Sequence, residues 1–470
     1  MTSTDNILKL NVKKAKKPPV TIDNETPKTD DMIIKSNKLN TISSYKTDFD
    51  WEPLKKAELR ATKNQMRGGH TFGSPWKLVN SHSTCQQCLY SFEVDTYGRG
   101  CVHNCVYCYA KAELTVHGYW NNPYPAPVNI NEIRKVFHTV FETDRKSKWR
   151  KIMEQRIPIR IGSMSDSFMI MDRKYKVTLE LLKILKHYNY PYVIFTRSDL
   201  VAENEYTDVI DPNLASIQFS MSSTNDKLNK LIEPGAPSAL RRLKALKNLN
   251  KKGYWTTVRI NPVFPIYPDG YFTNPDFKWE GKIPKFEYSS FDMVDEIAQT
   301  GTPSILAGFG RFSSYSLNQI EKAAGFDLRQ MYNTDDKEKK SKRDYHFSDK
   351  EIRHYYEKIK ERCTINNVQF TTCYIGNGEN HFWKDQDLWS NKSDCCNIKG
   401  RVESFVTDSR QIPFEDRLKF TSHKTLKPVD AKTLHKPLSK DELFLMSLTR
   451  AKAKQLKTDN SLELPEQPRL

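Results

Sequence analysis

Residues 100–109 read Gly-Cys-Val-His-Asn-Cys-Val-Tyr-Cys-Tyr and place Cys101, Cys105 and Cys108 in a C-x3-C-x2-C pattern, with Tyr107 directly before the last cysteine. Three thiolates in so short a loop can hold three irons of a four-iron, four-sulfur cluster and leave the fourth iron without a protein ligand. An iron left open in this way can bind a small molecule through an amine and a carboxylate. At a low cluster potential it can also pass an electron to that molecule. The loop therefore predicts a redox cluster with one open iron.

The sequence around this loop and after it alternates between two kinds of pattern. From about residue 85 to residue 310, short apolar runs rich in β-branched residues alternate with amphipathic stretches. This alternation predicts strand–helix units and a parallel sheet, so the fold class is α/β. The expected strands are residues 157–161, 192–196, 216–220, 256–261 and 304–308.

Three of the amphipathic stretches carry their apolar residues at helical spacing, within residues 133–141, 179–185 and 240–249. The spacing gathers each apolar set on one face of a helix. Such helices cover the outside of a curled parallel sheet, as strand–helix–strand connections require. Further on, Ser348 and Glu351 form a capping box that begins a helix toward Cys363, and residues 368–372 form a short strand.

The chain of 470 residues divides into four segments by composition. Residues 1–75 are polar and lysine-rich without a sustained apolar period, so we expect a basic, disordered tail. Residues 76–330 carry the strand–helix pattern. Residues 331–407 form a cysteine-containing extension that includes a charged run, Asp335–Arg343, and residues 408–470 form a second lysine-rich polar tail.

Lysine and arginine outnumber aspartate and glutamate by 74 to 57, a net charge of +17 that favours polyanionic partners such as nucleic acid. No stretch approaches the roughly 18 consecutive apolar residues that span a bilayer, so we expect no membrane partner. The first residues lack the pattern of a signal peptide, which predicts a cytoplasmic protein. Thiols stay reduced there, so the nine cysteines are expected to bind metal or to react rather than to form disulfides.

Several further segments follow the cysteine loop in a fixed order. They are Ile-Arg-Ile-Gly-Ser-Met-Ser-Asp-Ser at 159–167, Arg-Lys-Tyr at 173–175, Ile-Phe-Thr-Arg-Ser-Asp-Leu at 194–200, Glu-Pro-Gly-Ala-Pro-Ser at 233–238, Arg-Arg-Leu at 241–243 and Val-Arg-Ile-Asn-Pro at 258–262. Together with the loop, these segments resemble the radical S-adenosylmethionine (SAM) superfamily, and more narrowly its spore photoproduct lyase-like branch. The resemblance extends over roughly residues 95–265.

The resemblance implies a partial (β/α)6 barrel, with the cysteine loop after its first strand and the cofactor across the C-terminal ends of the strands. Cys101, Cys105 and Cys108 would bind a 4Fe-4S cluster whose open iron chelates SAM. An electron donor such as flavodoxin or ferredoxin would reduce the cluster. Reductive cleavage of SAM would then give a 5′-deoxyadenosyl radical, which abstracts hydrogen from an unreactive carbon.

The resemblance also assigns residues to the cofactor. Tyr107 would contact the adenine, Ser165 the polar groups of SAM and Arg197 its carboxylate. Arg197 replaces the lysine that is usual in this branch, and arginine keeps the charge while adding a bidentate fork. Ser163 stands where the lyase has a cysteine that donates a hydrogen atom. Because a serine O–H is a far poorer hydrogen-atom donor than a thiol, the resemblance does not carry the lyase reaction itself to this chain.

Resemblance and charge together predict a nucleic-acid substrate, on which the enzyme would act as a lesion lyase or a base-modifying enzyme. The alternative within the same chemistry is a protein or small-metabolite substrate. A second alternative is a non-catalytic, nucleic-acid-binding zinc ribbon. Sixteen residues separate the pair Cys85 and Cys88 from the pair Cys105 and Cys108, which is the ribbon spacing, although a ribbon leaves Cys101 and Tyr107 unexplained.

A second group of cysteines lies in the extension. Cys373, Cys395 and Cys396 are predicted to hold a second metal site, either an auxiliary iron–sulfur cluster or a zinc ion, with His381 nearby in sequence. The alternative is that these cysteines, like Cys363, are ordinary small buried residues. Both alternatives stay open on sequence alone.

Overall fold

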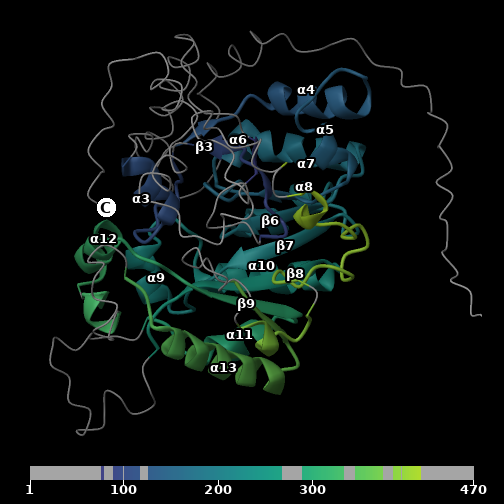
Figure 1. Cartoon of the computed structure of the whole chain (residues 1–470). Coiled ribbons are helices and arrows are strands. Elements are labelled where there is room, and N and C mark those ends of the chain that lie inside the picture. The colour runs from purple at the N-terminus through teal and green to yellow at the C-terminus, as the bar shows by residue number, and fades with distance from the viewer. Residues whose placement is uncertain are drawn as a thin grey trace, which may run out of the picture. The chain divides into compact units, whose positions relative to one another are not determined.

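The computed structural model describes residues 76–78, 88–98, 100–116, 125–266, 288–325, 327–332, 345–373, 385–392, 394–413 and 416 (Figure 1). Residues 1–75 and 417–470, which make up most of the predicted tails, lie outside the described residues, as do Cys85, His381 and the charged run 335–343. Over the described part of the chain, no helix is both long enough and apolar enough to cross a bilayer.

An eight-stranded sheet forms the centre of the described chain. Its strands lie in the order β1 (Trp76–Leu78), β2 (Phe92–Val94), β5 (Ile159–Ile161), β6 (Tyr192–Thr196), β7 (Ala215–Ser220), β8 (Trp255–Val263), β9 (Ser304–Phe309) and β10 (Gln369–Thr372). The strands from β2 to β10 are parallel, and β1 pairs with β2 in the antiparallel sense. In these residues β1 and β10 do not pair, so the sheet stays open. The expected partial barrel is confirmed, with seven parallel strands instead of six.

Helices connect the strands and follow their order, from α4 at the top of Figure 1 to α13 at the bottom. A short hairpin of β3 (Tyr97–Gly98) and β4 (Ala126–Pro127) stands apart from the sheet. The described helices are α3 (Tyr109–Val116), α4 (Ile130–Phe141), α5 (Arg150–Glu154), α6 (Asp172–Tyr175), α7 (Val177–His187), α8 (Asn204–Thr207), α9 (Asp226–Ile232), α10 (Ala239–Lys251), α11 (Met293–Ala298), α12 (Ser314–Ala324) and α13 (Asp349–Ile365). Four 3-10 turns add η4 (Asp199–Ala202), η5 (Leu328–Met331), η7 (Gln386–Leu388) and η8 (Ser409–Gln411).

Most of the expected elements are present, with small differences at their ends. The strand at 192–196 matches β6, and the others start or end within two residues of the expected positions. The three amphipathic stretches fall within α4, α7 and α10. The capping box is also confirmed, because Ser348 Oγ accepts from Glu351 N at 3.3 Å and Ser348 N donates to Glu351 Oε2 at 2.8 Å.

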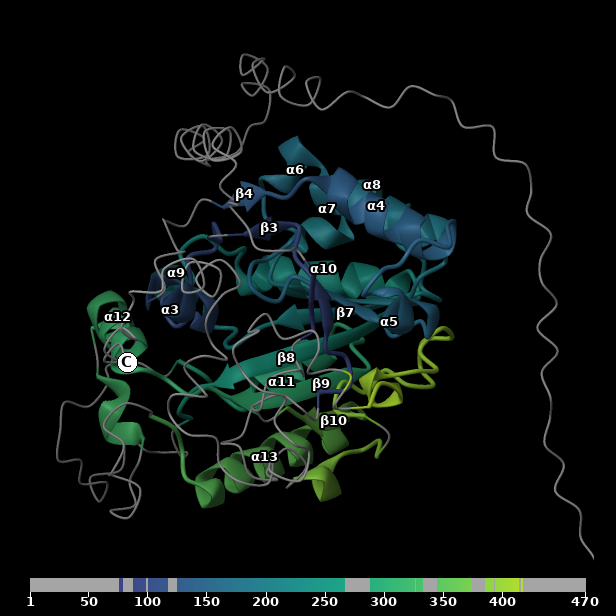
Figure 2. The ribbon, with the colours of Figure 1, turned by 45° about the horizontal axis from the view of Figure 1, so that its top comes forward.

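The two faces of the parallel sheet differ in chemistry, since successive side chains of a strand point to opposite sides. The outer face is apolar and packs against helices, as Phe92 does against Trp149 beside α5 and Phe370 against Tyr356 of α13. Figure 2 shows α13 beside β9 and β10. The register places the following residues together on what we call the inner face: Glu93, Arg160, Val193, Phe195, Ser216, Gln218, Thr257, Arg259, Ser304, Leu306, Gln369 and Thr371.

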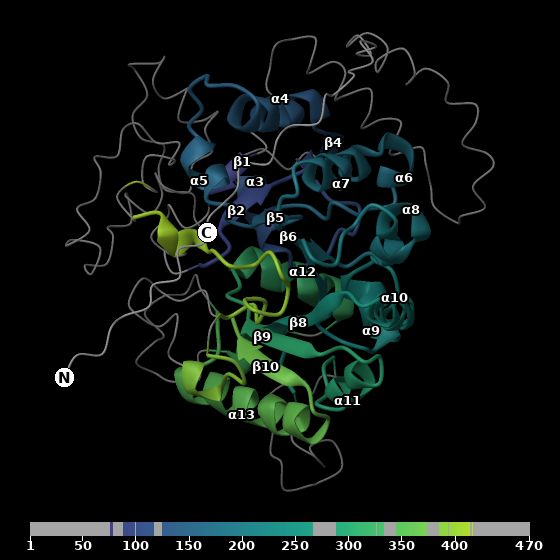
Figure 3. The ribbon, with the colours of Figure 1, turned by 90° about the vertical axis from the view of Figure 1, so that its right-hand side faces the viewer.

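The C-terminal segment, residues 388–392 and 394–412, drawn in yellow-green in Figure 3, contacts the polar inner face near the starts of its strands. Asn397 donates from Nδ2 to Ser304 Oγ and to Gln369 Oε1, at 3.0 Å in each case, which fixes the segment near the starts of β9 and β10. Backbone hydrogen bonds then join it to the residues that precede β7 and β2, from Ser404 N to Asn213 O at 3.1 Å and from Ser409 N to Leu89 O at 2.8 Å. The segment therefore runs past the N-terminal ends of the strands.

Apolar side chains of this segment complete a buried cluster on the inner face. Its members are Leu89, Tyr90, Val193, Leu306, Trp389, Cys395, Cys396, Ile398, Val402 and Phe405. Parallel strands are normally covered on both faces, and here one face is covered by helices and the other by an irregular segment. The C-terminal segment thereby contacts the N-terminal ends of the strands. The C-terminal ends of the strands remain for a functional site.

Candidate metal and cofactor site

The cysteine loop follows β2 and β3 and leads into α3. Two tight turns shape it, with Asn104 N donating to Cys101 O at 3.1 Å and Cys108 N donating to Cys105 O at 3.3 Å. Asn104 has a φ of +48°, a left-handed conformation that asparagine tolerates better than most residues. Lys111 Nζ donates to the Asn104 side chain at 3.0 Å and stabilises the turn.

A second segment, residues 232–235, holds the loop in place. Val106 N donates to Ile232 O at 2.9 Å, and Gly235 N donates to His103 O at 3.0 Å. The two backbones approach so closely that a Cβ on Gly235 would lie 1.9 Å from Val102 O. Only glycine fits this approach without moving the loop.

A buried contact between a histidine and an aspartate joins the loop to the turn after β5. His103 Nε2 lies 3.0 Å from Asp166 Oδ2, and the His103 side chain is buried, with Nδ1 3.1 Å from Gly235 O. The structure thus shows a buried, hydrogen-bonded histidine. Asp166 also accepts from Thr196 Oγ1 at 2.8 Å and from Arg197 N at 2.6 Å. Burial alone would raise the pKa of Asp166, but His103 and the backbone N–H groups of Arg197 and Phe168 lower it.

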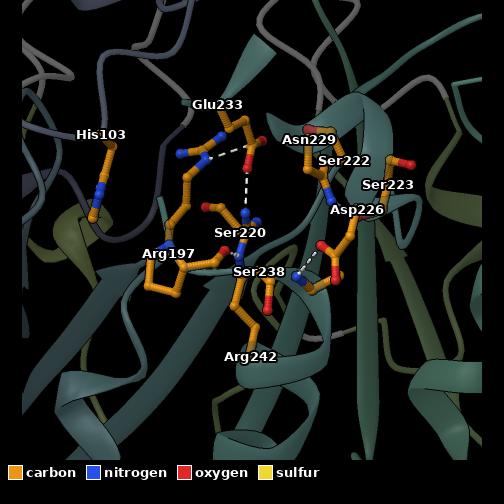
Figure 4. A network of polar contacts seen from close by, with 12 residues as sticks. His103, Arg197, Ser220, Ser222, Ser223, Asp226, Asn229, Glu233, Ser238 and Arg242 are labelled. Atoms are coloured by element: carbon orange, nitrogen blue, oxygen red, sulfur yellow. Dashed lines mark hydrogen bonds and ion pairs between the residues drawn. The ribbon is translucent and has the colours of Figure 1, made fainter. Parts of the chain in front are cut away.

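A fully buried carboxylate, Glu233, forms the centre of the site (Figure 4). Arg242 of α10 and the Tyr107 hydroxyl both donate to it, and Arg197 Nε lies 3.5 Å from its Oε1. Arg197 Nη2 also donates to the Tyr107 hydroxyl at 3.0 Å. Burial alone would raise the pKa of Glu233, but Arg242 and Arg197 lower it to about 2. The carboxylate is therefore ionised and links the loop, β6 and α10.

The residues predicted to bind the cofactor lie at the C-terminal ends of neighbouring strands. Arg197 directly follows β6, and Ser165 lies in the turn after β5, where its Oγ donates to Tyr97 O at 2.7 Å. Tyr107 is buried with its ring edge against Phe264 at 5.3 Å between centroids. Tyr107 and Arg197 are thus in direct contact, whereas Ser165 stands beside Asp166 on the other side of the loop.

Of the three cysteines of the loop, Cys105 is buried and Cys101 and Cys108 are half-buried. Burial raises the pKa of Cys101 to about 12, with a further contribution from Asp166. Burial also raises the pKa of Cys105 well above its ordinary value, although Arg197 opposes this shift. A bound metal supplies the positive charge that keeps such thiols deprotonated. This donor set of three sulfurs and a nearby guanidinium fits a cluster with an open iron.

The cysteines of the extension lie in two different places in the structure. Cys373, Cys395 and Cys396 lie on the inner face, whereas Cys363 is buried on α13 near Asp295. A hydrogen bond from Cys395, together with the charges of Arg259 and Arg160, lowers the pKa of Cys396. In the residues that the structure describes, no group of three or more His, Cys, Asp or Glu side chains is placed to hold a single metal ion.

The surroundings of Cys88 bear on the zinc-ribbon alternative. Arg160 Nη1 donates to Cys88 Sγ at 3.7 Å on the inner face, whereas the charged neighbours of Cys105 are Arg197 and Glu233 at the C-terminal ends of the strands. Cys88 and Cys105 therefore lie in different surroundings, which does not fit a single four-cysteine ribbon site.

Sequence comparison identifies the domain that contains this site. Residues 96–273 match the model of the Radical SAM superfamily. The chain carries a Radical SAM domain. The expectation drawn from the cysteine loop and its following segments is thereby confirmed, and the matched range contains Cys101, Cys105, Cys108 and Arg197 as well as Glu233.

Among curated proteins, this chain is similar to two uncharacterized ones. The protein MJ0683 of Methanocaldococcus jannaschii is 28% identical over 170 residues, which cover 35% of this chain and 58% of that protein. ORF301 of Acidianus two-tailed virus is 25% identical over 181 residues, which cover 35% of this chain and 54% of that protein. The chain thus spans a little over half the length of these relatives.

Solved structures that align with this chain include two with SAM bound. A spore photoproduct lyase variant with bound AdoMet and dinucleoside spore photoproduct aligns with a TM-score of 0.43 and 16% identity, covering 69% of this chain and 94% of that one. Streptococcus suis SuiB bound to S-adenosylmethionine aligns with a TM-score of 0.37 and 12% identity, covering 75% of this chain and 61% of that one.

Sequence reasoning left Glu233, Arg242 and Asp166 of the Radical SAM domain without roles, although all three lie in segments that it singled out. The available signal was a glutamate and two adjacent arginines close together around an unusual Pro-Gly-Ala-Pro run. Sequence spacing does not show that Arg242 reaches back across the start of α10 to Glu233. The ion pair between these two residues is seen only in the structure.

Gly235→Ala should displace the cysteine loop, because the added Cβ would collide with the backbone carbonyl of Val102. We expect iron incorporation to fall several-fold on anaerobic reconstitution, measured as iron per chain. Gly253→Ala is the control for strain alone: Gly253 has a φ of +83°, which alanine adopts only with strain, but its Cβ would meet nothing within 4 Å. Its iron content should match that of the wild type. Equal iron content in the Gly235 variant would contradict the close fit.

Glu233→Gln should destabilise the fold by about 3–5 kcal/mol at neutral pH, because Arg242 would be left buried without its counter-charge. Since the pKa of Glu233 is lowered to about 2, the ion-pair stabilisation is present above its ordinary pKa of about 4.3. It is lost as pH falls toward about 2. The difference between variant and wild type in urea unfolding should shrink across that window.

Glu357→Gln is the matched control for that experiment. Glu357 forms an exposed i,i+4 pair with Arg353, and such pairs contribute only about 0–1 kcal/mol. If both substitutions cost the same at neutral pH, the central role of Glu233 is wrong.

Proposed function

We propose that this protein is a radical SAM enzyme that holds a 4Fe-4S cluster through Cys101, Cys105 and Cys108 and acts on a nucleic acid. The observation that carries the first part is a three-thiol loop, fastened across the C-terminal ends of parallel strands, with a cation beside it. When bound, the cluster would reduce SAM and break its sulfur–C5′ bond to give a 5′-deoxyadenosyl radical. A low-potential electron donor, such as flavodoxin or ferredoxin, would supply the electron.

The charge balance around Glu233 supports a carboxylate-binding role for Arg197. Two guanidiniums, Arg197 and Arg242, share this one carboxylate, so the three groups carry a net positive charge. Arg242 is fully buried, whereas the Arg197 side chain keeps 21% of its surface exposed. Arg197 is therefore the cation that can reach the carboxylate of SAM. Arg242, which is fully buried, offsets the charge of Glu233.

Tyr107 and Ser165 would orient the remaining parts of SAM. Tyr107 is fixed by its bonds to Glu233 and Arg197, so its ring presents a rigid surface for an adenine. The Ser165 hydroxyl donates to Tyr97 O, and its oxygen can still accept a hydrogen bond from an amine or hydroxyl of the cofactor. Both side chains are held before the cofactor arrives, which lowers the entropy cost of binding.

The net charge of +17 supports a nucleic-acid substrate, since phosphates are neutralised by lysine and arginine. The hydroxyl at position 163 supports a reaction other than one that needs a thiol there. Ser163 Oγ donates to Glu93 Oε2 at 2.5 Å, so it is engaged in positioning Glu93. We therefore place the activity among base modifications or lesion repairs in which Ser163 gives up no hydrogen atom.

Anaerobically reconstituted protein should produce 5′-deoxyadenosine from SAM when dithionite is added, as quantified by chromatography. A variant with Cys101, Cys105 and Cys108 all changed to Ala should produce none, because no cluster forms. Cys363→Ala is the matched control and should keep wild-type production, since Cys363 is buried on α13. Production by the triple variant, or none by a wild type that holds its cluster in the presence of nucleic acid, would refute the proposed chemistry.

Binding to DNA or RNA should weaken steeply with salt, because phosphate contacts release counterions. Between about 50 and 200 mM salt we expect at least about a tenfold loss of affinity, measured by fluorescence anisotropy. An uncharged peptide nucleic acid of the same sequence is the control and should not bind. Salt-independent binding, or no binding, would favour a protein or small-metabolite substrate.

A further inference from the structure

Four cysteines from three separate parts of the chain meet on the inner face. Cys88 precedes β2, Cys373 follows β10, and Cys395 and Cys396 are adjacent in the C-terminal segment. Cys395 and Cys396 belong to the buried cluster around Leu306, and Cys373 packs against that cluster. Phe195 also packs against that cluster, and the two arginines over its ring contact Cys88 and Cys373. Cys373 and Cys88 both raise the pKa of Cys395.

Two guanidiniums from the inner face contact these thiols. Arg160 of β5 donates from Nη1 to Cys88 Sγ at 3.7 Å, and Arg259 of β8 donates to Cys373. Their guanidinium carbons lie 5.1 and 4.6 Å from the centre of the Phe195 ring. Both cations are therefore held in the same small region as the cysteines.

The charges of the two arginines are balanced differently. Arg160 pairs with the Glu93 carboxylate, whereas Arg259 donates at 2.8 Å to Gln218, which is neutral. Within the described part of the chain, no carboxylate pairs with Arg259, although its side chain is almost fully buried. Burying a cation without a counter-charge destabilises the fold. A negatively charged group next to Arg259 would remove this cost. Thiolates bound to a metal supply that charge.

Unpartnered polar atoms on the same face give an independent indication of a ligand. Gln218 Nε2, Thr257 Oγ1 and Thr371 Oγ1 are fully buried and find no hydrogen-bond partner among the described residues. Gln218 and Thr257 are register neighbours, and Thr371 is paired with Leu306 of the buried cluster. A buried donor that stays unpaired destabilises the folded state. All three can donate to sulfur, and inorganic sulfides and thiolates accept such bonds.

We propose that Cys88, Cys373, Cys395 and Cys396 bind a second iron–sulfur cluster on the inner face, with Arg160, Arg259, Gln218 and Thr257 around it. The four thiols are not gathered about one ion, and a cubane cluster places each thiolate on a different iron. Because all four irons would have protein ligands, this cluster has no open iron. The proposal does not depend on the radical chemistry of the loop.

Cys363 is a buried cysteine in surroundings that do not favour metal binding. Its side chain is fully buried on α13, and the charged group that acts on it is Asp295, a carboxylate. A carboxylate disfavours a thiolate, whereas Arg259 and Arg160 favour one. Cys363 is therefore the matched control for substitutions at the inner face.

The test is the iron and sulfide content of the full chain after anaerobic reconstitution. We expect about eight irons and eight sulfides per wild-type chain, as two cubane clusters require. Changing Cys373, Cys395 and Cys396 together to Ser should leave about four of each. Changing Cys101, Cys105 and Cys108 to Ser should also leave about four, and Cys363→Ser should leave the wild-type content unchanged.

Spectroscopy separates the two clusters. In the variant that lacks the loop cysteines, the electron paramagnetic resonance signal of the reduced cluster should not change on addition of SAM, because every iron is already ligated. Cys88→Ser and Cys373→Ser, at half-buried positions, test the same site where the triple change harms folding, and each should lower the iron content. A wild type with about four irons, all lost with the loop cysteines, would overturn the proposal, and so would one zinc per chain lost with Cys373.

Discussion

The site depends on one buried charge. Glu233 lies just after α9, and its carboxylate contacts Tyr107 from the cysteine loop, Arg197 from the end of β6 and Arg242 from α10. A carboxylate without these cations would be too costly to bury, and the cations without the carboxylate would repel each other. The position of the cysteine loop relative to the sheet is therefore fixed by an electrostatic requirement as well as by the backbone bonds around Gly235.

The sheet separates two kinds of chemistry. Its outer face is packed with apolar side chains against helices, as in other parallel sheets, and its inner face carries arginine, glutamine and threonine. The helix-covered face supplies the burial that stabilises the fold, and the inner face supplies cations and hydrogen-bond donors. This division lets one set of strands present polar groups to its interior while stability comes from the other side.

Periodicity made the strands and helices predictable, because the apolar outer face and the helix stripes leave regular traces in sequence. The loop cysteines were predictable for a different reason, since their spacing is local. What sequence could not show is which distant residues meet. Arg242 reaches Glu233 only after α10 folds back, and Cys88 contacts Ser409 only because the C-terminal segment crosses the sheet. Composition predicted that segment as a separate extension, because its short apolar runs lack the period of a strand or helix.

The C-terminal segment also sets the order in which the chain can fold. Ser409 Oγ donates to Cys88 O across 321 residues, and this contact lies beside the first parallel strand. Closing a loop of that length is slow, and it cannot occur during synthesis until residue 409 has left the ribosome. Until then the polar inner face stays in water while the outer face can already pack against its helices. The inner face of the sheet is thus completed last, when residue 409 reaches residue 88.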